Sequence, residues 1–155
     1  GLTFAMLVVF VEELTRFALV PDAFPVVADS PVLSGVLWLG VAVLLVAPAG
    51  LHLLAAVETL LLAVLAPDRG GVSETVQVLG YATAPCVFAG IPSPLVRAAC
   101  GLYAFGLLVI GVRVVHRVST TRAFVLALVP GTIAFGYGFR GIDAITTLLR
   151  NWYII

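Results

Sequence analysis

The stretch from Val72 to Pro92, VSETVQVLGYATAPCVFAGIP, decides the fold class of this chain. It is long enough to cross a bilayer, because a membrane-spanning helix needs about 20 mainly apolar residues. No charged residue follows Glu74 within it. The pair Gly80-Tyr81 and the internal Pro85 interrupt the run, and a proline inside a helix removes a hydrogen bond and bends the axis. The stretch therefore predicts a membrane helix that is built to bend.

The composition of the whole chain also indicates a membrane protein. Of its 155 residues, 62% are hydrophobic and 10% are charged, whereas soluble domains have about 25% charged residues. A soluble fold of this length has too little interior for so much apolar surface, but a bilayer can accommodate it. The net charge is zero, which argues against the basic surface of a nucleic-acid-binding protein. We expect a single transmembrane domain over residues 1–155, with the lipid bilayer and no nucleic acid as its partner.

Apolar runs predict an all-α polytopic membrane bundle with five spans. The runs are, in chain order, Leu2–Val20, Val32–Ala66, Val72–Ile91, Leu95–Val115 and Ala123–Phe139. Continuous apolar segments should be helical, because lipid offers the backbone no hydrogen bonds. The second run consists of two shorter ones, Val32–Ala47 and Leu51–Ala66, separated only by a short segment that contains Pro48. We therefore expect one long broken helix there, with a kinked extension or a partial re-entry, instead of two complete crossings.

The arginines indicate the orientation. Cytoplasmic loops of membrane proteins carry an excess of basic residues. Five crossings that start from a cytoplasmic N-terminus place four arginines on the cytoplasmic side: Arg69, Arg113, Arg117 and Arg122. Six crossings would place the turn over Val112–Arg122 outside. We therefore expect a multi-pass protein of the cell membrane with a cytoplasmic N-terminus.

The C-terminal segment follows a different pattern. After Gly141, apolar residues recur at helical spacing opposite polar ones, and Trp152 and Tyr153 follow. Amphipathic helices with aromatic anchors typically lie in the membrane interface. We expect a short interfacial helix here, with a partner-facing or frayed tail as the alternative.

Polar residues within the apolar runs are candidates for function, because ionisable side chains in a membrane are costly. They are Glu12, Glu13, Arg16, His52 and Glu58. Glu12 and Arg16 are four residues apart, so one helix face can pair them. His52 and Glu58 are six apart and do not share a face. Two alternatives are open: both side chains meet other helices, or His52 bonds a carbonyl freed by Pro48. The alternative to a functional role is a structural ion pair near a helix end.

The glutamates, histidines and cysteines raise the question of a catalytic or a metal site. Glu12 and Glu13 followed by Arg16 resemble the first motif of glutamate-dependent intramembrane proteases, whose chemistry would require Glu13 within hydrogen-bond reach of His52 or His116. The later Phe-x-x-x-His motif of one such group is missing. The histidines and cysteines lack metal-ligand spacing, so we expect no metal and no cofactor. The two cysteines, Cys86 and Cys100, are expected to be buried and free.

Several motifs occur in a recognisable order over Pro48–Pro130. They are Leu51-His52-Leu53, Gly70-Gly71, Ser73-Glu74-Thr75, Gly80-Tyr81-Ala82-Thr83-Ala84-Pro85, Ile91-Pro92, Leu102-Tyr103, Ile110-Gly111-Val112, His116 and Ser119-Thr120, followed by Pro130. This order resembles the Yip family of Ypt/Rab-GTPase-interacting membrane proteins, in its prokaryotic branch. The resemblance implies five spans and a cytoplasmic N-terminus, with Gly80, Tyr81, Pro85, Gly111 and His116 as motif residues.

These observations lead to three hypotheses of decreasing weight. The first is a non-enzymatic membrane scaffold that organises partners or the bilayer, its partners being other membrane proteins or a second copy of the chain. The second is a small oligomeric transporter or channel, in which broken helices free backbone carbonyls around a cavity lined by His52 or Glu58. The third is the glutamate-dependent intramembrane protease.

Overall fold

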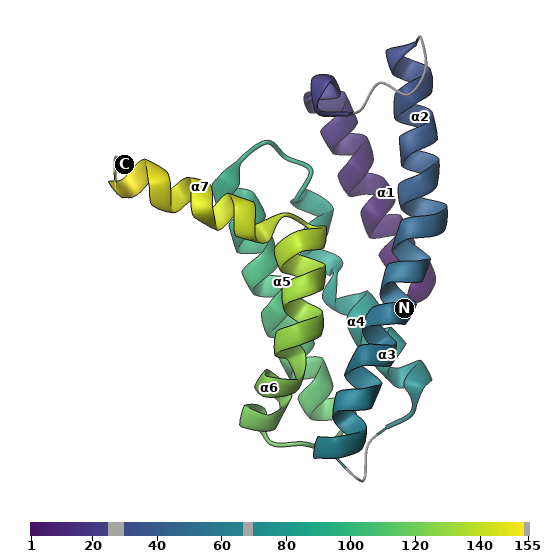
Figure 1. The fold of residues 1–155 in the computed structure, drawn as a ribbon, viewed down its shortest axis with the longest axis vertical. Helices are drawn as coiled ribbons and strands as arrows, with labels where there is room; N and C mark the ends of the chain where they lie inside the picture. The colour runs from purple at the N-terminus through teal and green to yellow at the C-terminus, as the bar shows by residue number, and fades with distance from the viewer. Residues whose placement is uncertain (25–29, 67–69, 154–155) are drawn as a thin grey trace.

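The predicted all-α fold is confirmed by a computed structural model, which describes residues 1–24, 30–66 and 70–153. Every element within these ranges is helical. In chain order they are α1 (Leu2–Leu19), η1 (Pro21–Ala23), α2 (Pro31–Val41), η2 (Ala42–Val46), α3 (Ala47–Leu65), α4 (Val72–Ala82), η3 (Ala84–Phe88), α5 (Pro94–Val115), α6 (Thr120–Gly131), η4 (Thr132–Gly138) and α7 (Gly141–Tyr153). Helices α1 to α6 form a bundle, and α7 projects away from one end of it (Figure 1).

The second apolar run forms one very long helix. Elements α2, η2 and α3 follow each other without a gap over 35 residues, Pro31–Leu65. At about 1.5 Å per residue this is roughly 52 Å, well beyond the hydrocarbon thickness of about 30 Å. Pro48 lies in the first turn of α3, directly after the π-helical η2. The expected break is thus a local change of helical pitch, and α3 continues the course of α2 (Figure 1).

The stretch that indicated the fold class is interrupted where the sequence predicts. Helix α4 ends at Ala82, and the chain passes into the 3₁₀-helical η3 with Pro85 in its first turn. The hydroxyl of Thr83 donates to the carbonyl of Gly80 at 2.7 Å, which closes the last turn of α4. The interruption therefore ends the α-helix instead of bending it.

The glycines and the tyrosine of the family-like motifs lie at helix contacts. A Cβ atom at Gly111 of α5 would approach Val78 Cγ1 of α4 to 2.6 Å, so these two helices pack closely only because the side chain is missing. Gly80 lies against the backbone of Gly1. The Tyr81 ring contacts Phe4 of α1, with ring centroids 5.4 Å apart.

Two helices of the described chain are long and apolar enough to cross a membrane. They are Pro31–Leu65 and Pro94–Val115, and a third qualifies if α6, η4 and α7 count together across their 69° bend. Helix α1 carries three charged residues, Glu12, Glu13 and Arg16, within its 18 residues. Five crossings therefore remain a prediction.

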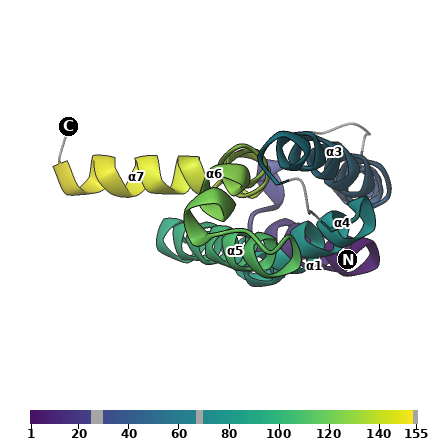
Figure 2. The ribbon, with the colours of Figure 1, turned by 90° about the horizontal axis from the view of Figure 1, so that it is seen from below.

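Helix α7 confirms the helix expected after Gly141. Its first turns pack against α5 through the buried Gly141 and Ala144. Its last turns extend beyond the bundle (Figure 2), where Trp152 is 83% exposed. Its position in the membrane interface remains a prediction.

Candidate functional site

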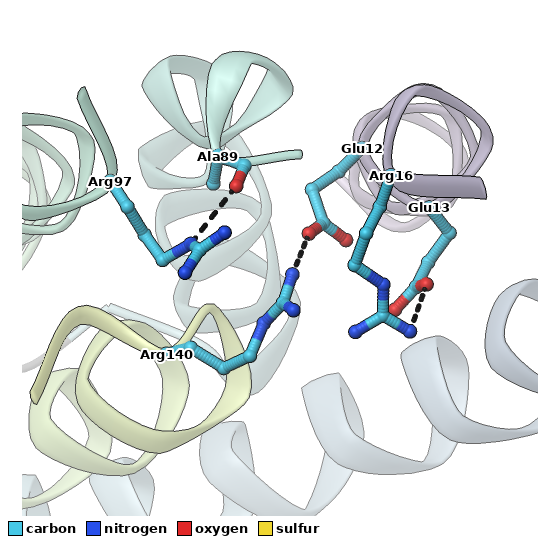
Figure 3. Close-up of polar contacts among 6 residues, drawn as sticks. All are labelled: Glu12, Glu13, Arg16, Ala89, Arg97 and Arg140. Carbon is cyan, nitrogen blue, oxygen red and sulfur yellow. Dashed lines mark hydrogen bonds and ion pairs between the residues drawn. The ribbon is translucent and has the colours of Figure 1, made fainter. Parts of the chain in front are cut away.

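Five charged side chains gather at the end of the bundle where α7 begins, and we call them the charged cluster. They are Glu12, Glu13 and Arg16 of α1, Arg97 of α5, and Arg140 between η4 and α7 (Figure 3). Three positive and two negative charges thus lie among apolar helices. Ionisable groups in such surroundings are expensive unless they are paired, so their pairing indicates what the cluster does.

The shortest contact of the cluster joins the first helix to the residue just before the last one. Arg140 Nη2 donates to Glu12 Oε1 at 2.6 Å, across 128 positions of sequence. Glu12 is only 3% exposed. A short hydrogen bond between two ionised groups is about twice as strong as a neutral one. The pair therefore ties α1 to the start of α7.

The turn after η3 brings α1 and α5 to this pair. A Cβ atom at Gly90 would overlap the backbone oxygen of Glu12, so a glycine is required for α1 to approach this closely. In the same turn, the carbonyl of Ala89 accepts a hydrogen bond of 3.2 Å from Arg97 Nε. Figure 3 shows the Arg97 and Arg140 side chains converging from different elements beside Glu12.

Arg140 holds an unusual backbone conformation. Its φ is +58°, in the left-handed region, which costs a residue with a side chain roughly 1–2 kcal/mol. The chain turns by 69° at this point, from η4 into α7. Arg140 was not among the residues that the sequence singled out. The sequence feature that could have indicated Arg140 is its position as a single arginine. It follows the aromatic, glycine-rich run that ends at Phe139, and it precedes Gly141.

The predicted pairing of Glu12 with Arg16 is wrong. Arg16 Nη2 lies 2.8 Å from Glu13 Oε2, three residues earlier in the same helix, because Glu12 points to Arg140 (Figure 3). The Arg16 guanidinium also lies over the ring of Phe24, 4.3 Å from its centroid. This contact is a cation–π interaction.

The two histidines are engaged elsewhere. His116 follows α5, where its Nδ1 accepts from the Gly70 amide at 3.1 Å and its Nε2 lies 3.4 Å from Thr75 Oγ1. It thereby joins the end of α5 to the turn before α4. His52 Nδ1 lies 2.7 Å from the Pro48 carbonyl within its own helix. A proline leaves the carbonyl one turn earlier without a donor. His52 therefore bonds the carbonyl of Pro48 itself and not the carbonyl that Pro48 frees.

The glutamates of the cluster and the histidines do not converge. Arg97 lies in the first turn of α5 and His116 directly follows its end, 19 positions later, which corresponds to about 28 Å along the helix. The charged cluster and His116 therefore lie at opposite ends of the bundle, and Glu13 pairs with Arg16. The geometry that a glutamate–histidine protease requires is not formed by these residues.

The remaining candidates lie apart from the cluster. Glu58 of α3 is 0% exposed, and neither of its oxygens has a hydrogen-bond partner. An apolar cavity of about 130 Å³ lies between α5, η4 and α7, with Phe105 and Ile142 among its walls, and neither His52 nor Glu58 lines it. Both cysteines are buried and free, as predicted.

The chain was compared with known proteins. Residues 1–139 match the family model described as the Yip1 domain. No curated protein and no solved structure matches the chain significantly. The matched range ends at Phe139, so Glu12 lies inside it and its partner Arg140 directly follows it.

Proposed function

We propose that this chain, which belongs to the Yip1 domain family, is a non-enzymatic membrane scaffold that organises partners or the bilayer. The observation that carries the proposal is the Glu12–Arg140 pair. It uses the most deeply buried charge of the cluster to fix the direction of α7. The charged groups therefore have a structural role, since each glutamate of the cluster has an arginine within 2.8 Å.

The fixed helix is suited to act at a membrane surface. Leu149 is 50% exposed, and Trp152 and Tyr153 are more exposed still. Aromatic residues of this kind anchor helices at the boundary between water and lipid. A rigid bundle that holds such a helix at its edge offers a surface to the lipid headgroups and to neighbouring membrane proteins.

The orientation of the scaffold follows from its arginines. Arg113, Arg117 and Arg122 lie at the His116 end of the bundle, and the positive-inside rule assigns that end to the cytoplasm. Helix α1 begins near the middle of the bundle and runs away from the end where α6 begins (Figure 1), so we infer that its N-terminus faces the cytoplasmic side. We infer five crossings within one domain over residues 1–155, with α7 at the outer leaflet.

Site-specific photo-crosslinking in native membranes tests the scaffold. A photoreactive amino acid is placed at Leu149 of α7 or, as the matched control, at Leu60 of α3, which is 69% exposed. We expect a discrete protein adduct from position 149 that is missing from position 60. Its mass distinguishes another membrane protein from a second copy of the chain. Identical adducts from both positions would argue against the scaffold, and lipid adducts alone would argue against protein partners at α7.

A further inference from the structure

One carboxyl group of the chain stands apart from the charged cluster. Glu58 is fully buried, and both of its carboxyl oxygens are without a hydrogen-bond partner. The other three glutamates all have partners. Glu12 and Glu13 pair with arginines, and Glu74 accepts the Gly71 amide at 2.5 Å. Among the four glutamates, Glu58 is therefore the one that is buried without a partner for its carboxyl group.

The surroundings of Glu58 are apolar. It shares the buried face of α3 with Leu51, Ala55 and Leu62, none of them more than 7% exposed. This helix packs against α1, α4 and α6.

The charged groups of those three helices are paired with other groups or exposed. The charges of α1 belong to the charged cluster, Glu74 of α4 caps its own helix, and Arg122 of α6 is exposed near the start of that helix. Element η4, which also touches α3, contains no charged residue. No cation among these groups is paired with Glu58.

The burial of Glu58 limits what it can bind. A side chain of another protein or a hydrated ion cannot reach a group that has no exposed surface. A carboxylate without a partner in an apolar interior costs several kcal/mol or more, and such groups take up a proton instead. A proton needs no cavity and no path wide enough for water. We propose that Glu58 is a proton-binding site inside the bundle, where it is held as a neutral carboxylic acid.

Proton binding at this position has a structural consequence. The ionised form of Glu58 would need water or a cation, and both require α3 to move away from α1, α4 or α6. Release of the proton is therefore coupled to separation of these helices. The buried hydroxyl of the adjacent Thr59 also has no hydrogen-bond partner, so the same separation would hydrate two polar groups.

Infrared spectroscopy of the purified protein tests the protonation state directly. At neutral pH we expect the carbonyl stretch of a protonated carboxylic acid, and ¹³C labelling of glutamate in the unmodified chain should shift it. The Glu58→Gln variant should lose this band, whereas the matched Glu13→Gln variant should retain it. No protonated-acid band from glutamate, or a band that persists in Glu58→Gln, would overturn the proposal.

Unfolding measurements on the same variants give an independent test. Glutamine has nearly the shape of a neutral glutamic acid but cannot ionise in the unfolded chain, so at neutral pH Glu58→Gln should be at least as stable as the unmodified chain. Glu58→Leu should fold at least as well, because it removes unpartnered polar atoms. A loss of tenfold or more in Glu58→Gln would show that the carboxylate makes an ionic contact, and would contradict the proposal. Where a variant fails to fold, the absence of a protonated-acid band from the labelled unmodified chain still overturns the proposal.

Discussion

The Glu12–Arg140 pair predicts a large and specific loss of stability in the Glu12→Gln variant. The Glu12 side chain is 5% exposed and that of Arg140 is 25% exposed. Removal of one partner from a buried ion pair costs about 3–5 kcal/mol, because the other charge is left uncompensated. Arg140 keeps part of its contact with the surroundings, so we expect a loss of about 2–3 kcal/mol in the free energy of unfolding.

The backbone of Arg140 supplies a second part of this prediction. Arg140→Ala removes the ion pair but keeps a side chain at a φ of +58°, whereas Arg140→Gly removes the pair and relieves that conformation. We expect Arg140→Gly to be more stable than Arg140→Ala by about 1 kcal/mol. The difference separates the role of the guanidinium from that of the turn.

Equilibrium unfolding in mixed micelles measures these values, and a double-mutant cycle between Glu12 and Arg140 isolates their coupling. Glu13→Gln is the matched control. Its partner Arg16 lies three positions away on the same helix, so the pair can persist where the denatured chain keeps its helices, and the variant should lose less free energy of unfolding than Glu12→Gln. If Glu12→Gln is no more destabilising than Glu13→Gln, the reasoning about the long-range pair is refuted.

Three further substitutions test other contacts. Gly90→Ala should destabilise the bundle by about 1–3 kcal/mol, because its Cβ overlaps the backbone of α1. The control Gly106→Ala has open space at its Cβ and should not destabilise the bundle. Equal unfolding curves for the two variants would contradict the close approach of α1 to Gly90. His116→Ala should lower the free energy of unfolding by about 1–3 kcal/mol, because it removes the acceptor of a backbone amide in the turn before α4. Amide hydrogen exchange in that turn should accelerate. The control His52→Ala removes a bond within one helix and should leave that exchange unchanged. Pro85→Ala should let α4 continue past Ala82, and unaltered amide protection in η3 would show that the interruption is set by packing.

The helices themselves were largely predictable from the sequence, because apolar runs in a membrane leave the backbone few alternatives. The expected run Leu95–Val115 corresponds to α5, Pro94–Val115, and the break near Pro85 occurs where predicted. The form of the second helix was less accessible. A proline after Ala47 indicates a missing donor, but only the neighbouring turns determine whether the helix kinks or accommodates it in a π-helical segment.

The pairing within the charged cluster was not predictable for a different reason. Local spacing favours Glu12 with Arg16, and no periodic pattern connects Glu12 with a residue 128 positions later. The choice depends on the turn at Gly90, which brings α1 against η3, and on the left-handed backbone of Arg140. Both are properties of the assembled bundle. The sequence does not determine which face of α3 is buried, because every face of this helix is apolar. The burial of Glu58 was therefore not predictable.

The long-range ion pair has a consequence for biosynthesis. Glu12 leaves the ribosome 128 residues before Arg140, which at about 5–20 residues per second is an interval of roughly 6–26 s. During that time Glu12 has no arginine partner from the end of the chain, and an unpaired charge within a membrane helix is costly. Stable insertion of the first helix therefore depends on the synthesis of Arg140. Ribosomes stalled before Arg140 should leave α1 accessible to water-soluble labels.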